Sequence, residues 1–151
     1  MKTFMTAILG LLLAAGGGAV LASSKAAPAM FTPDTVHWVA GTGDEKGRSV
    51  AVLVGNRSQS GTFIVRFKLP DGYMAPPHWH ASDEYLTVLE GTLLWGAGDT
   101  MDKSKATVLP AGSFVVVPKG IHHWAMAKGT TIVQVDVMGP FVRHVVKHGS
   151  M

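Results

Sequence analysis

The chain has 151 residues, of which 47% are hydrophobic and 15% are charged. This composition excludes a disordered chain, which needs low hydrophobicity and high charge, and it suits one domain with its own core. The formal net charge is only +3, and Lys and Arg are scattered, so the charge pattern indicates no nucleic-acid binding. There are 0 cysteines, which excludes disulfides, thiolate metal sites and a Cys nucleophile.

Residues 1–22 have the order of a secretory signal peptide: the positive charge of Lys2, an apolar stretch around residues 8–15, and small residues before Ser23. We predict cleavage after Ala22 and an exported protein, periplasmic or secreted. The alternative is an uncleaved membrane anchor, because the uncharged stretch is nearly long enough to span a bilayer. The three glycines of residues 16–18 favour cleavage, and no other contact with a membrane is expected.

The rest of the chain alternates turn signals rich in Gly, Pro, Asn and Asp with short apolar segments, which predicts an all-β domain. Within Phe63–Leu69 the apolar residues fall at every second position, as in a strand with one buried face. The other predicted strands are Ser49–Val54, Glu84–Glu90, Leu93–Trp95, Thr107–Leu109, Ser113–Val117, His122–Ala127, Thr130–Val137 and Phe141–Val146. Eight or nine short strands indicate a sandwich or barrel. We assign residues 23–35 to a flexible leader, 36–146 to the domain and 147–151 to a tail.

The segment from His78 to Glu84 carries the first candidate metal ligands. Residues two apart on a strand point to the same side, so His78 and His80 can reach one ion. Glu84 follows four positions later and can supply a carboxylate if the chain bends between them. Asp83 is the competing acid, but neighbours on a strand face opposite ways, so only one of the two can enter the site.

His123 is the fourth candidate, about forty residues further on, after the turn signal Pro118-Lys119-Gly120. His122 is adjacent, and strand parity again allows only one of the pair to face the site. Three neutral imidazoles and one carboxylate suit a divalent transition metal such as Mn, Fe, Ni, Cu or Zn. They leave one or two coordination positions open for water, substrate or oxygen.

Two stretches resemble the motifs of the cupin superfamily. Gly72–Gly91 reads as Gly, five residues, His-x-His, three residues, Glu, six residues and Gly, and Gly112–His123 matches the second motif. That motif usually ends in Asn four positions after its His, where this chain has Ala127. The resemblance implies a small β-barrel of jelly-roll type with a metal inside its mouth. It carries over His78, His80, Glu84 and His123 as ligands and favours His123 over His122.

The resemblance leaves the activity open. The first hypothesis is a metal-dependent enzyme of oxygenase, isomerase or lyase type acting on a small molecule, with Tyr85 or Glu90 as a possible acid or base. The second is a non-catalytic protein of the cell envelope that binds or senses a small molecule or metal. The third is a structural partner of another envelope protein. A homodimer is also expected, with Phe141–Val146 as a candidate edge. Gln134 and Asp136 face either solvent or a polar cavity wall.

Overall fold

The computed structural model describes residues 27–147. The predicted signal peptide, the start of the predicted leader and residues 148–151 of the predicted tail lie outside the described residues. In chain order the elements are β1 (Val39–Ala40), the 3-10 helix η1 (Gly43–Glu45), β2 (Ser49–Val54), β3 (Gly61–Leu69), β4 (Met74–His80), β5 (Glu84–Ala97), the 3-10 helix η2 (Lys103–Lys105), β6 (Thr107–Pro110), β7 (Phe114–Val117), β8 (His123–Gly139) and β9 (Arg143–Val145). Within the described residues no helix is long and apolar enough to cross a membrane.

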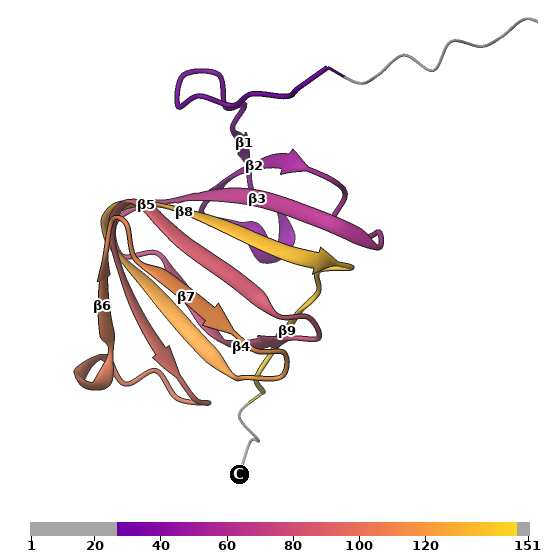
Figure 1. Cartoon of the computed structure of the whole chain (residues 1–151). Coiled ribbons are helices and arrows are strands. Elements are labelled where there is room, and N and C mark those ends of the chain that lie inside the picture. Colours follow the sequence, from indigo (N-terminus) through magenta and orange to yellow (C-terminus); the bar gives the residue numbers. More distant parts are fainter. Residues whose placement is uncertain (1–26, 148–151) are drawn as a thin grey trace, which may run out of the picture. The chain divides into compact units, whose positions relative to one another are not determined.

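Two long strands, β5 and β8, run through both layers of the fold (Figure 1). The first half of β5 and the second half of β8 belong to a layer with the order β1-β2-β3-β8-β5-β7. The other halves belong to a layer with the order β9-β4-β8-β5-β6. All pairings are antiparallel. This is the predicted all-β jelly-roll arrangement.

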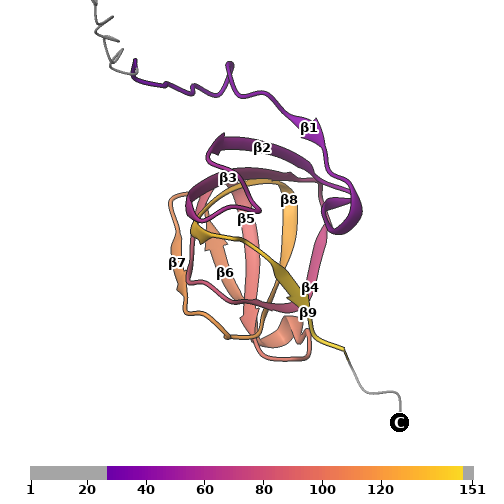
Figure 2. The ribbon, with the colours of Figure 1, turned by 90° about the vertical axis from the view of Figure 1, so that its right-hand side faces the viewer.

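The sheet does not close into a complete barrel. Among the described residues β1, β6, β7 and β9 each pair with one neighbour only. Figure 2 shows the two layers curving around a common interior. The strands therefore enclose a core while leaving edges at both ends of the sheet.

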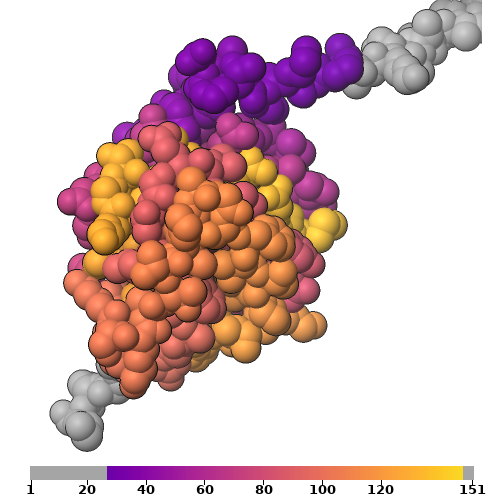
Figure 3. Space-filling view, turned by 60° about the vertical axis from the view of Figure 1, so that its left-hand side comes forward, coloured from indigo at the N-terminus to yellow at the C-terminus, as the bar shows by residue number. Residues whose placement is uncertain are grey.

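The core lies between the inner faces of β3, β5 and β8. The predicted alternation of β3 is confirmed, because Phe63, Val65, Phe67 and Leu69 are all buried. Arg66 points to the outer face, where its Nε donates to Oε1 of Gln134 at 3.0 Å. On another face β6 and β7, in orange in Figure 3, make up part of the surface, and their Val108, Phe114 and Val116 are exposed.

The predicted strands differ from the observed ones mainly at the bends. Two pairs of predicted strands are single bent strands, β5 and β8, which pass through Gly91 and Gly129. At these two positions a turn residue marks a bend within a strand rather than the end of the strand. The series of predicted strands also omitted β1 and β4, and β4 runs from Met74 through two prolines to His80.

Gly91 makes the bend of β5 possible. Its φ is +74°, and a Cβ placed on it would lie 2.3 Å from the carbonyl oxygen of Thr130. Gly72 has the same φ of +74°, but no atom lies within 4 Å of the corresponding Cβ position. Comparing the two glycines therefore separates the energetic cost of a positive φ from the energetic cost of a backbone clash.

We predict that Gly91→Ala destabilises the protein far more than Gly72→Ala. The positive φ alone costs on the order of 1–2 kcal/mol, and at Gly91 the clash with backbone adds to it. Urea unfolding of both variants measures the difference. Equal losses of unfolding free energy in the two variants would show that the close contact at the bend has no energetic weight.

Candidate metal centre

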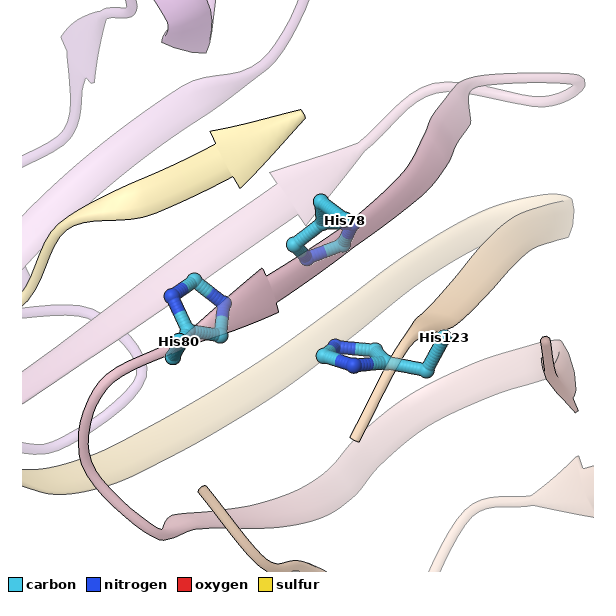
Figure 4. A group of neighbouring side chains, drawn as sticks. All are labelled: His78, His80 and His123. Atoms are coloured by element: carbon cyan, nitrogen blue, oxygen red, sulfur yellow. The ribbon is translucent and has the colours of Figure 1, made fainter. Parts of the chain in front are cut away.

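Three histidines face one another from two strands of the same layer. His78 and His80 lie two apart on β4, and His123 begins β8 directly opposite His78 in the antiparallel pair. Residues opposite one another in such a pair point to the same side of the sheet. All three are buried, and one ring nitrogen of each lies within 4.8 Å of the others (Figure 4).

The backbone fixes the orientation of each imidazole. Nδ1 of His78 lies 2.6 Å from the carbonyl oxygen of Pro76, Nδ1 of His80 lies 2.8 Å from that of Val142, and Nδ1 of His123 lies 3.0 Å from that of Ile121. A carbonyl oxygen can only accept a hydrogen bond, so each Nδ1 carries the proton. In the neutral rings Nε2 therefore presents a free lone pair, which is the form that binds metals.

Glu84 reaches the histidines from the other layer. It is the first residue of β5, where it pairs with Val117 and Val137. Its Oε2 lies 3.4 Å from Nε2 of His80 and 3.4 Å from Nε2 of His123. This oxygen is buried and has no hydrogen-bond partner. Glu84 stands beside two of the three histidines rather than within the tight three-histidine group.

This arrangement is unfavourable without a cation, because a buried carboxylate oxygen faces imidazole lone pairs. A proton would satisfy one such contact, whereas a metal ion would satisfy all of them together. Donor atoms about 2.1 Å from one zinc-like ion and separated by the tetrahedral angle are about 3.4 Å apart. The described residues therefore fit a metal ion in both donor type and spacing.

Burial favours the neutral form of two of the histidines, His78 and His80. Loss of solvation, followed by repulsion from His123, lowers the pKa of His78 to about 3. Loss of solvation also lowers the pKa of His80, although the neighbouring Glu84 acts in the opposite direction. Metal ligation requires neutral imidazole, so these lowered pKa values favour the metal-binding form of His78 and His80.

The two competing residues face away from the three histidines. Oδ1 of Asp83 accepts a hydrogen bond from the backbone N–H of Lys119 at 2.8 Å. The backbone N–H of Gly120 donates to the carbonyl oxygen of His80 at 2.8 Å. These bonds fix the loop before His123 to the loop that precedes Glu84. His122 instead pairs with Asp99 at the surface. Strand parity thus separates His123 from His122 and Glu84 from Asp83, as predicted.

A cavity of about 50 Å³ adjoins the four residues. Its further lining includes three arginines, four aromatic residues and seven aliphatic residues: Arg48, Arg57, Arg143, Tyr73, Trp95, Phe67, Phe141, Leu69, Ala75, Leu86, Leu93, Ala125, Val133 and Val135. The alternative in which Gln134 and Asp136 form a polar wall of the cavity is wrong, because Val133 and Val135 face the cavity instead. Tyr85 and Glu90 do not line it either, and Tyr85 stacks on Phe114 outside.

The fold and the site together define a jelly-roll protein with a group of three buried histidines that could hold a metal ion. Residues 45–149 match the family model described as Cupin. The match covers well over half of the chain, so the protein belongs to the cupin family. This confirms the resemblance seen in the two motifs.

The chain is similar to two curated plant proteins. It is 34% identical over 90 residues to Germin-like protein 3-1 of Oryza sativa subsp. japonica, covering 59% of this chain and 40% of that protein. It is 34% identical over 70 residues to Germin-like protein subfamily 3 member 2 of Arabidopsis thaliana, covering 46% of this chain and 31% of that protein. The chain thus spans less than half the length of either relative.

Among solved structures, the polyketide cyclase RemF from Streptomyces resistomycificus has a TM-score of 0.65 and 16% sequence identity, with 82% of this chain and 88% of that chain covered. At this identity the similarity supports the fold alone. It agrees with the all-β jelly-roll topology and says nothing about the ligand of this cavity.

Sequence reasoning missed the arginines and Trp95 around the cavity. Arg48, Arg57 and Arg143 are widely separated in sequence and lie outside both motifs. The ring of Trp95 stacks near His123, with centroids 6.0 Å apart. Arg143 pairs with His80 and so faces the same side, but this pairing is visible only in the structure.

We predict that the metal-free protein loses stability as the pH falls from 7 to 5. The folded-state pKa of His78 is below its ordinary value, so the unfolded state takes up protons first and gains stability below about pH 6.5. With a folded pKa of about 3, this histidine alone accounts for about 2 kcal/mol between pH 7 and pH 5. Burial of His80 acts in the same direction.

Urea unfolding of metal-stripped protein at both pH values measures this loss. His78→Gln removes the titrating group while keeping a side chain of related shape, so we expect a smaller loss in that variant. An identical pH dependence in the variant and the unchanged protein would contradict the assignment to His78.

Proposed function

We propose that this protein binds one divalent transition metal ion, Mn, Fe, Ni, Cu or Zn, through His78, His80, His123 and Glu84, and uses it on a small molecule. The observation that carries the proposal is the buried Oε2 of Glu84, which has no hydrogen bond and lies 3.4 Å from Nε2 of both His80 and His123. A cation is the one partner that suits an oxygen and several nitrogens whose lone pairs all point inward.

A metal bound here would supply Lewis acidity or redox chemistry next to the cavity. The chain's own residues have distinct tasks. The carbonyl oxygens of Pro76, Val142 and Ile121 hold the imidazoles in the tautomer that leaves Nε2 free. The apolar wall lowers the local dielectric and so strengthens electrostatic interactions inside the cavity.

The proposed activity is that of a metal-dependent enzyme of oxygenase, isomerase or lyase type. A non-catalytic binding or sensing protein is the alternative, and one observation favours it. Apart from the four proposed ligands, the described lining of the cavity offers the hydroxyl of Tyr73 and three arginines as its ionisable groups. The chain therefore brings little acid–base machinery, and catalysis would depend on the metal.

Export and a homodimer belong to the same proposal. The residue order of 1–22 supports export to the periplasm or medium, where metal supply differs from that of the cytoplasm. For the dimer, β9 supports the proposal as an edge strand, since among the described residues it pairs with β4 alone. Val142 and Val145 are exposed there, whereas Phe141 is buried and unsuited to an interface.

We predict that the purified protein binds one equivalent of Zn²⁺ and that His123→Gln weakens this binding. Loss of a ligand should exceed the roughly 10–100-fold that loss of an outer hydrogen bond to a ligand costs. Glu84→Gln should weaken binding too, because the charge is lost while the shape is kept. Isothermal titration calorimetry and elemental analysis measure affinity and stoichiometry.

His122→Gln is the matched control, since it changes the neighbouring imidazole, which faces Asp99 at the surface. Its affinity for Zn²⁺ should equal that of the unchanged protein. Equal losses in the variants of His122 and His123, or binding that is unaffected by Glu84→Gln, would contradict the proposed ligand set.

We also predict oxygen uptake or product formation when the protein carries iron, manganese or copper and is supplied with small acids, phenols or sugars. Elemental analysis of protein taken from its own compartment identifies the metal to test first. Turnover should disappear in His123→Gln and persist in His122→Gln. Tight metal binding without turnover on any of these substrates would favour the non-catalytic alternative.

A further inference from the structure

The cavity beside the metal centre carries more positive than negative charge. Three guanidinium groups line it, those of Arg48, Arg57 and Arg143, and Glu84 is the single carboxylate of its described lining. Glu45 forms ion pairs with Arg48 and Arg57. Nη2 of Arg143 donates to a backbone carbonyl oxygen, that of Asp44, at 2.8 Å. Arg143 therefore brings a charge that no carboxylate in the described residues neutralises, and a divalent metal would add two more.

Three side chains of this lining reach the cavity from different parts of the fold. Arg143 pairs with His80 across β9 and β4, so the two point to the same side. Trp95 pairs with Ala125, and Ala97, two residues further along β5, pairs with His123. The indole of Trp95 therefore lies on the same face of the sheet as the imidazole of His123. The guanidinium carbon of Arg48 lies 3.7 Å from the ring centroid of the buried Phe67, and its side chain is only 10% exposed.

Each of these side chains holds a buried N–H without an acceptor. The atoms are Nε of Arg48, Nε of Arg143 and Nε1 of Trp95. Buried donors in folded proteins nearly always have partners, and leaving one unpaired is costly. The only other unpaired buried side-chain atom in the described residues is Oε2 of Glu84. Some side chains of the cavity lining therefore carry lone pairs that suit a cation. Others carry N–H donors that suit a hydrogen-bond acceptor.

The acceptor must be small and is best negatively charged. The cavity of about 50 Å³ admits only a few non-hydrogen atoms. Loss of solvation, with repulsion from Arg143 and Arg57 among the further causes, lowers the pKa of Arg48 to about 10, which still leaves the group charged at neutral pH. A carboxylate offers two oxygens with about four acceptor sites and matches the planar donor geometry of guanidinium.

We propose that the natural ligand of this cavity is a small carboxylate, whose oxygens accept hydrogen bonds from Arg48, Arg143 and Trp95. The inference rests on the proposed metal centre for the other end of the ligand, since the same molecule lies between the donors and the metal. The N–H donors determine which ligand binds, and the imidazoles and Glu84 hold the ion that meets it.

The test uses acetate as the probe and acetamide as its neutral analogue of the same size. Titration calorimetry on the zinc-loaded protein, in a buffer free of carboxylates, should show acetate binding at least about tenfold more tightly than acetamide. Arg143→Gln and Trp95→Phe should each weaken acetate binding by about tenfold while one equivalent of zinc remains bound. Arg143→Lys keeps the charge but removes Nε–H, so it should fall between Arg143→Gln and the unchanged protein.

Arg66→Gln is the matched control, because it removes the same charge from the outer face of β3 and should leave acetate binding unchanged. Retained zinc binding in Trp95→Phe and Arg143→Gln shows that these variants are folded. If zinc binds but acetate binds no better than acetamide, or if Arg143→Gln equals Arg66→Gln, the carboxylate proposal is wrong and the metal centre stands. If zinc does not bind but metal-free protein prefers acetate in a manner that depends on Arg143, the carboxylate proposal stands and the metal centre falls.

Discussion

The main electrostatic constraint of the site is the approach of the Glu84 carboxylate to the Nε2 atoms of His80 and His123, 3.4 Å away on each side. The carboxylate comes from one layer of the fold and the imidazoles from the other. Buried lone pairs that face one another repel, so this contact opposes packing of the layers until a cation lies between them. A bound metal would then join the layers as well as provide chemistry, and metal binding would be coupled to stability.

Much of the arrangement of the histidines could be predicted from the sequence, because it depends on the local geometry of strands. Strand parity places His78 and His80 together and separates His123 from His122. The same parity could have excluded Tyr85 as an acid or base, since it follows the inward-facing Glu84 and must point outward. The spacing of the two motifs then identified the family, and the family model confirmed it. The role of the four residues as ligands stays a prediction.

The rest could not be predicted, because it depends on which strands become neighbours. The predicted strands stop short of Gly91 and Gly129, yet both glycines lie within long strands that bend from one layer to the other. The spacing after His80 and the motif predicted Glu84 beside the histidines, but not that its strand pairs in the other layer. The arginines are harder still: Arg48 and Arg143 are separated by almost the whole domain, and an isolated arginine in a sequence is most simply a surface residue.

The two sides of the cavity also differ in where they lie along the chain. His78, His80, Glu84 and His123 all belong to the stretches 72–91 and 112–123 that match the cupin motifs. The unpaired donors come from outside them: Arg48 precedes the first stretch, Trp95 lies between the two, and Arg143 follows the second. Within one backbone arrangement, the motif residues can therefore keep the metal side constant while residues elsewhere change the ligand that meets it. This separation is a physical reason why one fold can serve many different small molecules.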